Sequence, residues 1–264
     1  MRWHCIARRW QDAVTLPILV AFMSDQPAPR RFETTQWSLV QAAAGDNSTA
    51  ARRALAALCE TYWWPLYWFV RRRGHSVDDA QDLTQGFLTR LIDKQDVRMA
   101  RQERGRFRTF LLSAFTHYIA NEAQRERAQK RGAGIAPLPL EFEAAEHRYR
   151  LEAADTRTPE TLFDRRWAIT VLDRALQQLR RGETDAGRIV EFDLIKPSLL
   201  GTSPEGGYAG WARTLATTES AVKVAAHRLR KRFQRVLREE IAQTVSTDAE
   251  VDDELRYLMD ALRR

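Results

Sequence analysis

Cysteine is scarce in this chain, and neither of its two cysteines lies in a recognisable binding motif. Cys5 and Cys59 form no CxxC pair, and no histidine stands at a spacing from them that would ligate zinc. A disulfide scaffold and a zinc site are therefore not expected. We predict two reduced thiols, as in a cytoplasmic protein, and neither a metal nor another cofactor.

Apolar runs long enough to cross a membrane are lacking, and so are the short motifs of common enzyme classes. The chain has no HExxH motif, no EF-hand loop and no phosphate-cradling glycine loop. Asp78, Asp79 and Asp82 could join His75 as metal ligands, but no second histidine follows at helical spacing. The chain is accordingly expected to be neither an enzyme nor a membrane protein.

Strand-like alternation is rare, whereas helical periodicity dominates the chain. The predicted class is all-α, with two small helical domains joined by a linker and a helix-turn-helix at the end of the second. The 42 Lys and Arg residues exceed the 35 Asp and Glu residues, which gives a formal net charge of +7. This charge favours a polyanionic partner, although it does not distinguish DNA from RNA or an acidic protein.

The chain is predicted to divide into five parts. These are a disordered N-terminal extension (1–33), a helical domain (34–131), a linker (132–161), a helix-turn-helix domain (162–245) and an acidic tail with a short helix (246–264). The apolar stretch Ala13–Phe22 loosely imitates a signal peptide, but Pro17 interrupts it. Whether translation starts at Met1 or at Met23 is left open.

The segment from Tyr208 to Arg238 predicts a short helix, a tight break and a long basic helix. Thr217 and Thr218 are suitable N-cap residues for the second helix, and Glu219 would stabilise its positive end. Its outward positions are Ser220, Lys223, His227, Arg230, Lys231 and Arg235. Such side chains suit phosphates and base edges, so we interpret the segment as a DNA-binding element. The alternative is a surface helix whose charges are only solvated.

Two earlier segments carry charge on a helical pattern. The first helix is predicted to begin after Ser76 and to bury Ala80, Leu83, Phe87 and Leu91. Its other side is acidic and polar, with Asp78, Asp79, Asp82, Gln85 and Thr89. This side would repel phosphate but could dock a basic protein, and the alternative is again an ordinary solvated face.

The second segment, 101–131, interleaves basic and aromatic residues, as single-stranded nucleic acid binding requires. Some of its aromatic rings must also belong to a core. A further aromatic cluster, Trp63, Trp64, Tyr67 and Trp68, lies on a predicted helix over residues 49–73. We predict that this cluster packs in the core rather than on nucleotides, because it shares the helix with a regular aliphatic stripe.

Taken together, three motifs in order resemble the bacterial extracytoplasmic-function sigma factors. These motifs are Asp79–Phe87 (DAQDLTQGF), Gly105–Leu111 (GRFRTFL) and Ala221–Lys223 followed by Arg228, Arg230 and Arg232. The resemblance covers about residues 35–245 and is strengthened by three flanking matches. These are Thr34–Val40 (TTQWSLV), Glu240–Val245 (EIAQTV) and Glu250–Leu255 (EVDDEL).

The resemblance implies a sigma factor that binds the RNA polymerase core and selects and opens promoters, without covalent chemistry of its own. The implied core-binding residues are Asp79, Asp82 and Gln85. The implied contacts to the single-stranded minus-ten element are Arg106, Arg108, Phe115, Thr116, His117, Tyr118, Asn121 and Arg125. The implied contacts to the duplex minus-thirty-five element are Thr218, Ser220, Lys223, His227, Arg228 and Arg230. The rival interpretation is a helix-turn-helix regulator that acts without polymerase core.

The C-terminal tail leaves two alternatives open. Leu255, Leu258, Met259 and Leu262 fall at helical spacing after an acidic stretch, so the tail could dock on the protein and regulate it. A frayed terminal helix is the other interpretation. The sequence also leaves open whether an anti-sigma factor or another regulator binds.

Overall fold

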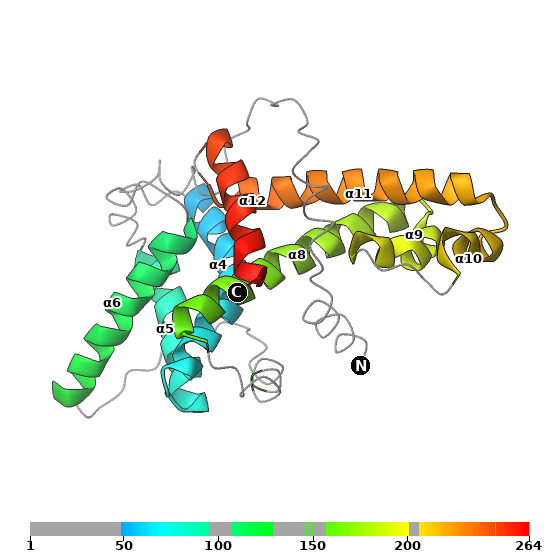
Figure 1. The fold of residues 1–264 in the computed structure, drawn as a ribbon. Coiled ribbons are helices and arrows are strands. Elements are labelled where there is room, and N and C mark those ends of the chain that lie inside the picture. Colours follow the sequence, from blue (N-terminus) through cyan, green and yellow to red (C-terminus); the bar gives the residue numbers. More distant parts are fainter. Residues whose placement is uncertain are drawn as a thin grey trace. The chain divides into compact units, whose positions relative to one another are not determined.

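The computed structural model describes residues 49–94, 107–128, 146, 149, 157–200, 206–245 and 247–263. All regular elements in these ranges are helices, so the prediction of an all-α fold is confirmed (Figure 1). The N-terminal extension 1–33 and most of the expected linker 132–161 lie outside the described residues.

Contacts divide the chain into two units, each described separately below. The first unit contains residues 31–170 and 241–262, and the second contains residues 171–240. The division falls inside two long helices, α8 (Pro159–Asp185) and α11 (Glu219–Ala242). It therefore differs from the boundaries expected from the sequence, because the start of α8 and most of the C-terminal tail belong to the first unit.

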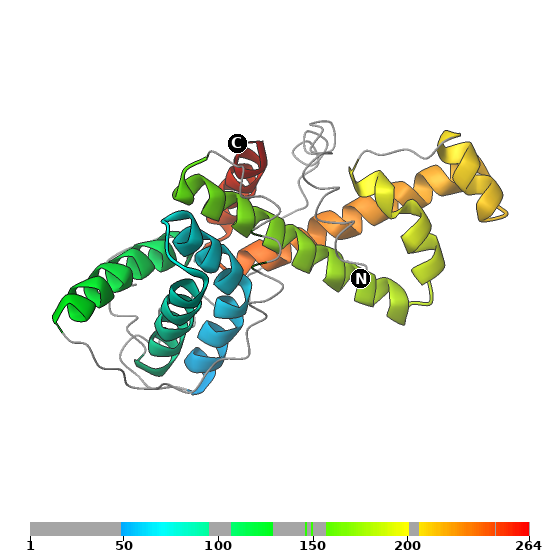
Figure 2. The ribbon, with the colours of Figure 1, turned by 90° about the horizontal axis from the view of Figure 1, so that it is seen from below.

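The first unit is built on α4 (Thr49–Arg72), α5 (Val77–Lys94) and α6 (Phe107–Ala128). Figure 2 shows these three helices side by side. α4 packs along α5, and α5 contacts α6. The aromatic cluster of α4 lies in the core as predicted: Trp64, Tyr67 and Trp68 are buried, and Trp63 is half-buried.

The start of α5 has a local explanation in its sequence. Gly74 has a φ of +89°, which lets the chain turn directly after α4. The Ser76 hydroxyl then accepts a hydrogen bond from the Asp79 amide at 3.1 Å and donates one to the Asp79 carboxylate at 2.7 Å. The first bond caps the Asp79 amide, and the second holds the two side chains together at the start of the helix. The buried side of α5 contains Ala80, Thr84, Phe87, Leu88 and Leu91, whereas Leu83 is only half-buried.

The C-terminal helix α12 (Asp248–Arg263) packs within the first unit. Its buried side contains Val251, Glu254, Leu258, Met259, Ala261 and Leu262. The first part of α8 contributes Leu162, Phe163 and Trp167 to the same unit, and the Tyr257 ring lies 6.2 Å from the Trp167 ring. Of the two interpretations of the tail, docking on the protein is therefore the one the fold shows.

The second unit contains the rest of α8 with α9 (Ile189–Ile195), the 3-10 helix η2 (Lys196–Leu200), α10 (Gly207–Thr214) and most of α11. Its core includes Leu176, Leu179, Phe192, Trp211 and Phe233. The buried stripe of α11 also contains Val222, Ala226, Leu229, Val236 and Leu237. The spacing of apolar residues in the sequence predicts Val222, Leu229 and Phe233 as inward positions, together with Ala225 or Ala226 and Val236 or Leu237. All of these are buried except Ala225, which is half-buried.

A short break separates α10 from α11, as the sequence predicted (Figure 1). Ala216 adopts a φ of +51°, which turns the chain out of α10. The Thr218 hydroxyl accepts a hydrogen bond from the Ala221 amide at 3.2 Å, so Thr218 is the N-cap of α11. The two helices and the break match the expectation. Their action as a DNA-binding helix-turn-helix stays a prediction.

Candidate functional site

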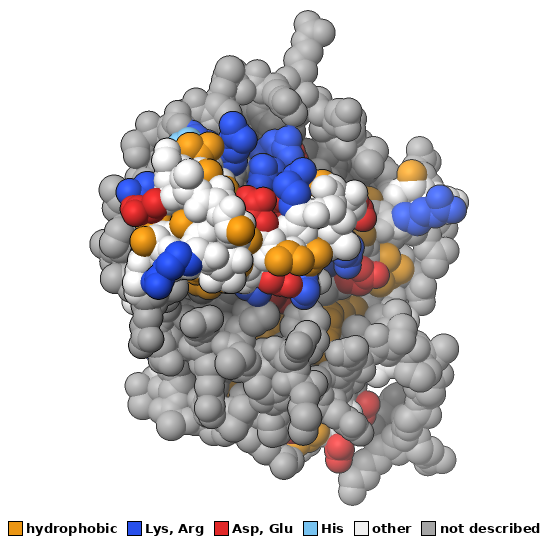
Figure 3. Space-filling view, turned by 90° about the vertical axis from the view of Figure 1, so that its right-hand side faces the viewer, with side chains coloured by type: hydrophobic (Ala, Val, Ile, Leu, Met, Phe, Trp, Pro, Cys, Tyr) orange, Lys and Arg blue, Asp and Glu red, His pale blue; other side chains and the backbone are white. Residues whose placement is uncertain are grey.

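The first candidate surface is the solvent side of α11. Its outward positions Thr218, Ser220, Lys223, His227 and Arg228 are all exposed. Arg230 is half-buried. Figure 3 faces this end of the second unit and shows a group of Lys and Arg side chains near the top of the view, with other basic, acidic and apolar side chains around it. We call the solvent side of α11 that carries these outward positions the α11 face.

Lys223 forms an ion pair within the α11 face. Its Nζ lies 2.7 Å from the Glu219 Oε1 one turn earlier, and 6.0 Å from the centre of the Tyr208 ring. The hydrogen bond to Glu219 and the charge of Glu219 raise the pKa of the Lys223 ammonium group. Lys223 therefore stays protonated, but a neighbouring carboxylate offsets part of its attraction for an anion.

The second candidate surface is the acidic side of α5, which we call the α5 face. Asp78, Asp79 and Asp82 are exposed, and Gln85 is half-buried. Asp79 also holds the Ser76 cap, so part of its role is structural. Asp82 is the expected core-binding residue whose charge is exposed and not used in this cap.

Two residues expected to contact DNA are buried instead. The Phe115 ring is fully buried, 4.7 Å from the Phe87 ring and 6.2 Å from the Phe69 ring. Phe115 thus fills the interface of α4, α5 and α6, and its assignment to a base pocket is wrong for this fold. Arg108 is the second buried residue, and Arg106 lies outside the described residues.

Arg108 lies in an internal ion cluster. Its Nε is 3.1 Å from the Glu254 Oε1 of α12, and its Nη1 is 2.8 Å from the Asp164 Oδ1 of α8. The guanidinium carbon lies 3.9 Å from the centre of the Tyr257 ring and 4.9 Å from that of Trp167. Burial lowers the pKa of Arg108, but the carboxylates of Glu254 and Asp164 outweigh this effect and raise it. Its charge is therefore neutralised inside the protein rather than by phosphate.

The other described residues of the expected minus-ten set lie at or near the surface of α6. His117, Asn121 and Arg125 are exposed at intervals of four residues, so they form one stripe, which we call the α6 stripe. The Arg125 guanidinium lies 2.8 Å from the Glu122 carboxylate. Thr116 is half-buried, and its hydroxyl donates a 2.8 Å hydrogen bond to the Leu112 carbonyl.

The Tyr118 hydroxyl lies within the electrostatic influence of charged residues on both α5 and α6. Burial raises the pKa of this hydroxyl, and the charge of Glu122 raises it further. Arg90 and Arg125 act in the opposite direction, and Asp82 contributes a smaller rise. Asp82 and Tyr118, which the sequence assigned to different partners, are therefore close enough to influence each other electrostatically.

A glycine of the acidic motif makes room for Tyr118. The ring of Tyr118 lies 5.6 Å from that of Phe87. A Cβ atom on Gly86 would come within 2.6 Å of the Tyr118 hydroxyl oxygen. Gly86 thus permits a close approach of α5 and α6 that a larger residue would hinder.

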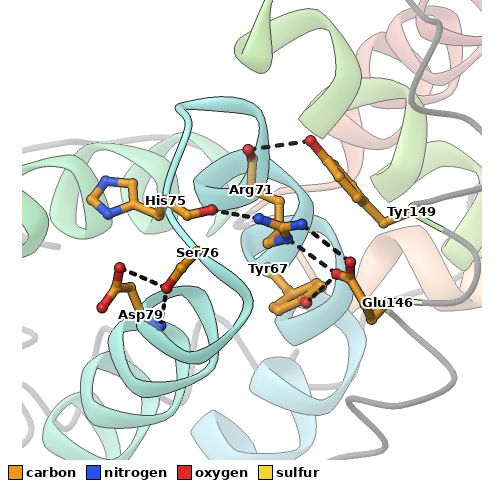
Figure 4. Close-up of polar contacts among 7 residues, drawn as sticks. All are labelled: Tyr67, Arg71, His75, Ser76, Asp79, Glu146 and Tyr149. Carbon is orange, nitrogen blue, oxygen red and sulfur yellow. Dashed lines mark hydrogen bonds and ion pairs between the residues drawn. The ribbon is translucent and has the colours of Figure 1, made fainter.

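A second ion cluster attaches part of the expected linker to α4 (Figure 4). Glu146 accepts hydrogen bonds from the Tyr67 hydroxyl at 2.7 Å and from the Arg71 Nε at 3.0 Å. The Tyr149 hydroxyl donates a 3.3 Å hydrogen bond to the Arg71 carbonyl, and the Arg71 guanidinium lies 4.5 Å from the centre of the Tyr149 ring. Arg71 also donates to the His75 carbonyl just before α5. The cluster thus fixes the turn that precedes α5.

Comparisons with known proteins found no significant match. This result holds for models of protein families, for curated proteins and for solved structures. None of the helices in the described part of the chain is both long and apolar enough to cross a membrane. Among the same residues, no group of three or more His, Cys, Asp or Glu could hold a metal ion.

The sequence interpretation missed the Arg108 cluster, although one signal for it was present. Glu254 lies three residues after Val251 and four before Leu258, so it occupies an apolar position of an amphipathic helix. A carboxylate at such a position is almost never fully buried unless it is paired. The spacing therefore indicated that a partner exists, but it did not identify Arg108.

Proposed function

We propose that the chain is a sigma factor of the extracytoplasmic-function type, which binds RNA polymerase core and recognises promoter DNA. The observation that carries this proposal is the opposite charge of two exposed surfaces, the acidic α5 face and the basic α11 face. Both lie opposite buried apolar stripes on their helices. Each is therefore available to a partner of opposite charge, a protein for the first and DNA for the second.

The α11 face suits duplex DNA. Ser220, Lys223 and His227 are exposed on successive turns, so they can reach base edges when the helix lies in the major groove. The longer Arg228 and Arg230 can reach the phosphates beside it. This assignment makes α11 the reader of the upstream, minus-thirty-five element.

The α6 stripe suits the opened downstream element, with a smaller set of residues than the sequence suggested. His117, Asn121 and Arg125 offer exposed hydrogen-bond donors, and Tyr118 offers part of an aromatic ring. Such groups bind unstacked bases and the backbone of a single strand. In this proposal the chain selects the promoter and supplies part of the free energy that separates the DNA strands, and the polymerase makes the phosphodiester bond.

Gel filtration with purified polymerase core tests this proposal. A sigma factor should form a stoichiometric complex with the core, and Asp82→Arg should weaken that complex because it reverses an exposed charge of the α5 face. Asp185→Arg is a matched control, since Asp185 is an exposed aspartate of α8 in the second unit. Absence of a complex with the wild-type chain would contradict the sigma-factor proposal.

One observation favours a second candidate, a helix-turn-helix regulator that acts without polymerase core. The burial of Arg108 and Phe115 removes two expected contacts to single-stranded DNA and leaves the α11 face intact. A duplex-only binder would need the α11 face alone. Permanganate footprinting separates the two candidates, because only a sigma factor with core should make thymines near the start site reactive.

A further inference from the structure

Exposed apolar side chains are rare in the described part of the chain. Among the large hydrophobic residues there, the exposed ones are Val190, at 76%, and Val224, at 45%. An isolated exposed valine is ordinary on a protein surface. What distinguishes Val224 is its position on α11, in the middle of the polar α11 face.

Val224 lies on the side of α11 that faces away from the core. It follows the buried Val222 by two residues, which places it roughly 200° around the helix. Ser220 and His227 lie on the same side, one turn before and one turn after Val224. Lys223 is its immediate neighbour. An apolar side chain therefore interrupts a run of hydrogen-bonding groups.

Folding gives no reason for a valine at this position. A β-branched side chain restricts χ1 in a helix and lowers helix propensity, and an exposed side chain has little packing to compensate. Small residues surround it: Ala221 is exposed and Ala225 is half-buried. Together with Ser220, they let the helix backbone approach a partner closely enough for the short valine to touch it.

In the major groove, the thymine C5-methyl group is the apolar feature of the base edges. We infer that Val224 contacts a thymine methyl in the upstream element and is a specificity-determining residue of the α11 face. This inference rests on the proposed function, because it requires α11 to lie in the major groove. The polar neighbours position the helix on the duplex, and Val224 favours thymine over a base that lacks the methyl group.

The test removes the methyl group alone. Preferred duplexes are first selected from a randomised pool, both with the full chain and with the chain bound to polymerase core. Each thymine of the preferred sequence is then replaced, one at a time, by deoxyuridine, which keeps all hydrogen-bonding groups. Affinities are measured for the wild type, for Val224→Ala and for Val190→Ala, the matched control at the other exposed valine.

We expect at least one thymine whose replacement weakens wild-type binding by about fourfold, the effect of burying one methyl group. Val224→Ala loses both γ-methyl groups, so it should lose most of the difference between the thymine and deoxyuridine duplexes, and Val190→Ala should behave as the wild type. Val224→Thr retains one γ-methyl group, so it should keep part of the preference. Circular dichroism should show all three variants folded, since both valines are exposed.

Two results would overturn the inference while leaving DNA binding intact. One is a selected sequence in which no thymine methyl affects affinity. The other is an equal methyl effect in the wild type and in Val224→Ala. A pool from which neither preparation enriches any sequence has a different meaning, because it would overturn DNA recognition by α11 and the role of Val224 with it.

Discussion

α11 and α6 are both long helices with several basic residues, yet they use those residues differently. The exposed side of α11 keeps Lys223 and Arg228 at the surface, opposite one continuous buried stripe. On α6, Arg108 is buried while Arg125 is exposed. Position along the helix, rather than charge, decides whether an arginine can reach a partner outside the protein.

The difference follows from what surrounds each helix. The start of α6 is enclosed on several sides: the Phe107 amide donates a 3.0 Å hydrogen bond to the Thr244 carbonyl, and the Phe107 ring lies 5.0 Å from that of Tyr62. Arg108, Phe110 and Leu111 are buried in the same turn. Beyond Phe115 only one side of α6 is buried, so the residues of the α6 stripe are exposed to solvent.

The largest expected effect comes from breaking the buried cluster. Arg108→Ala should lower the free energy of unfolding by roughly 3–5 kcal/mol, because it leaves the buried Glu254 and the half-buried Asp164 without their cation. Arg125→Ala is the control, and it should change stability by less than about 0.5 kcal/mol, since Arg125 is exposed. Urea denaturation measures both. An Arg108→Ala protein of normal stability and impaired DNA binding would restore Arg108 to the DNA-contacting set.

Substitutions on the two helices should affect different steps, duplex binding for α11 and strand opening for α6. Lys223→Ala should lower affinity for the upstream duplex by roughly tenfold if Lys223 contacts a base edge. His117→Ala combined with Asn121→Ala should leave duplex affinity unchanged and reduce permanganate reactivity near the start site. A double variant that weakens duplex binding would show that the α6 stripe and the α11 face do not have separate targets.

The close approach of Gly86 to Tyr118 should make the stability effect of Gly86→Ala depend on the Tyr118 hydroxyl. In a Tyr118→Phe background, Gly86→Ala should stabilise the protein by roughly 0.5–1 kcal/mol, because alanine favours the helix and the clashing hydroxyl is gone. With Tyr118 present, the same substitution should bring little or no gain, since the new Cβ would lie 2.6 Å from the hydroxyl oxygen. Thermal unfolding of the four proteins measures this coupling. Equal gains in both backgrounds would mean that Tyr118 does not lie over Gly86.

The smallest expected effect concerns Glu219. Glu219→Gln removes the carboxylate that lies 2.7 Å from the Lys223 Nζ, so the full charge of Lys223 becomes available to DNA. Affinity for the upstream duplex should rise by about threefold at low salt, and the gain should shrink as salt increases. Fluorescence anisotropy over a salt series would detect it. No gain at low salt would show that Lys223 does not lie near the DNA.

Sequence periodicity was most informative where a helix has one buried side. For α11, the spacing predicted Val222, Leu229 and Phe233 as core residues, and all three are buried. On α5 the stripe was correct except for Leu83, which is half-buried while Thr84 is buried. Such an error of one residue arises because a helical stripe is wide enough to include either neighbour.

Periodicity failed at Arg108 and Phe115, where several helices meet. Both carry chemistry suited to nucleic acid, a guanidinium group and an aromatic ring, and the same chemistry suits a core with carboxylates and other rings. The choice depended on residues far along the chain, at Glu254, Asp164 and Phe87. Spacing within α6 contains no information on those partners.

The sequence by itself determined the helical class, the break before α11 and the polar sides of α5 and α11, because local spacing and capping residues specify these features. Only the tertiary structure decided that the tail helix packs in the first unit and that its Glu254 forms an ion pair with Arg108. It also decided that His117, Asn121 and Arg125 remain at the surface of α6. The physical reason is that burial of a charge depends on a partner brought near in space, and residues 146 positions apart in the chain acquire that proximity only through packing.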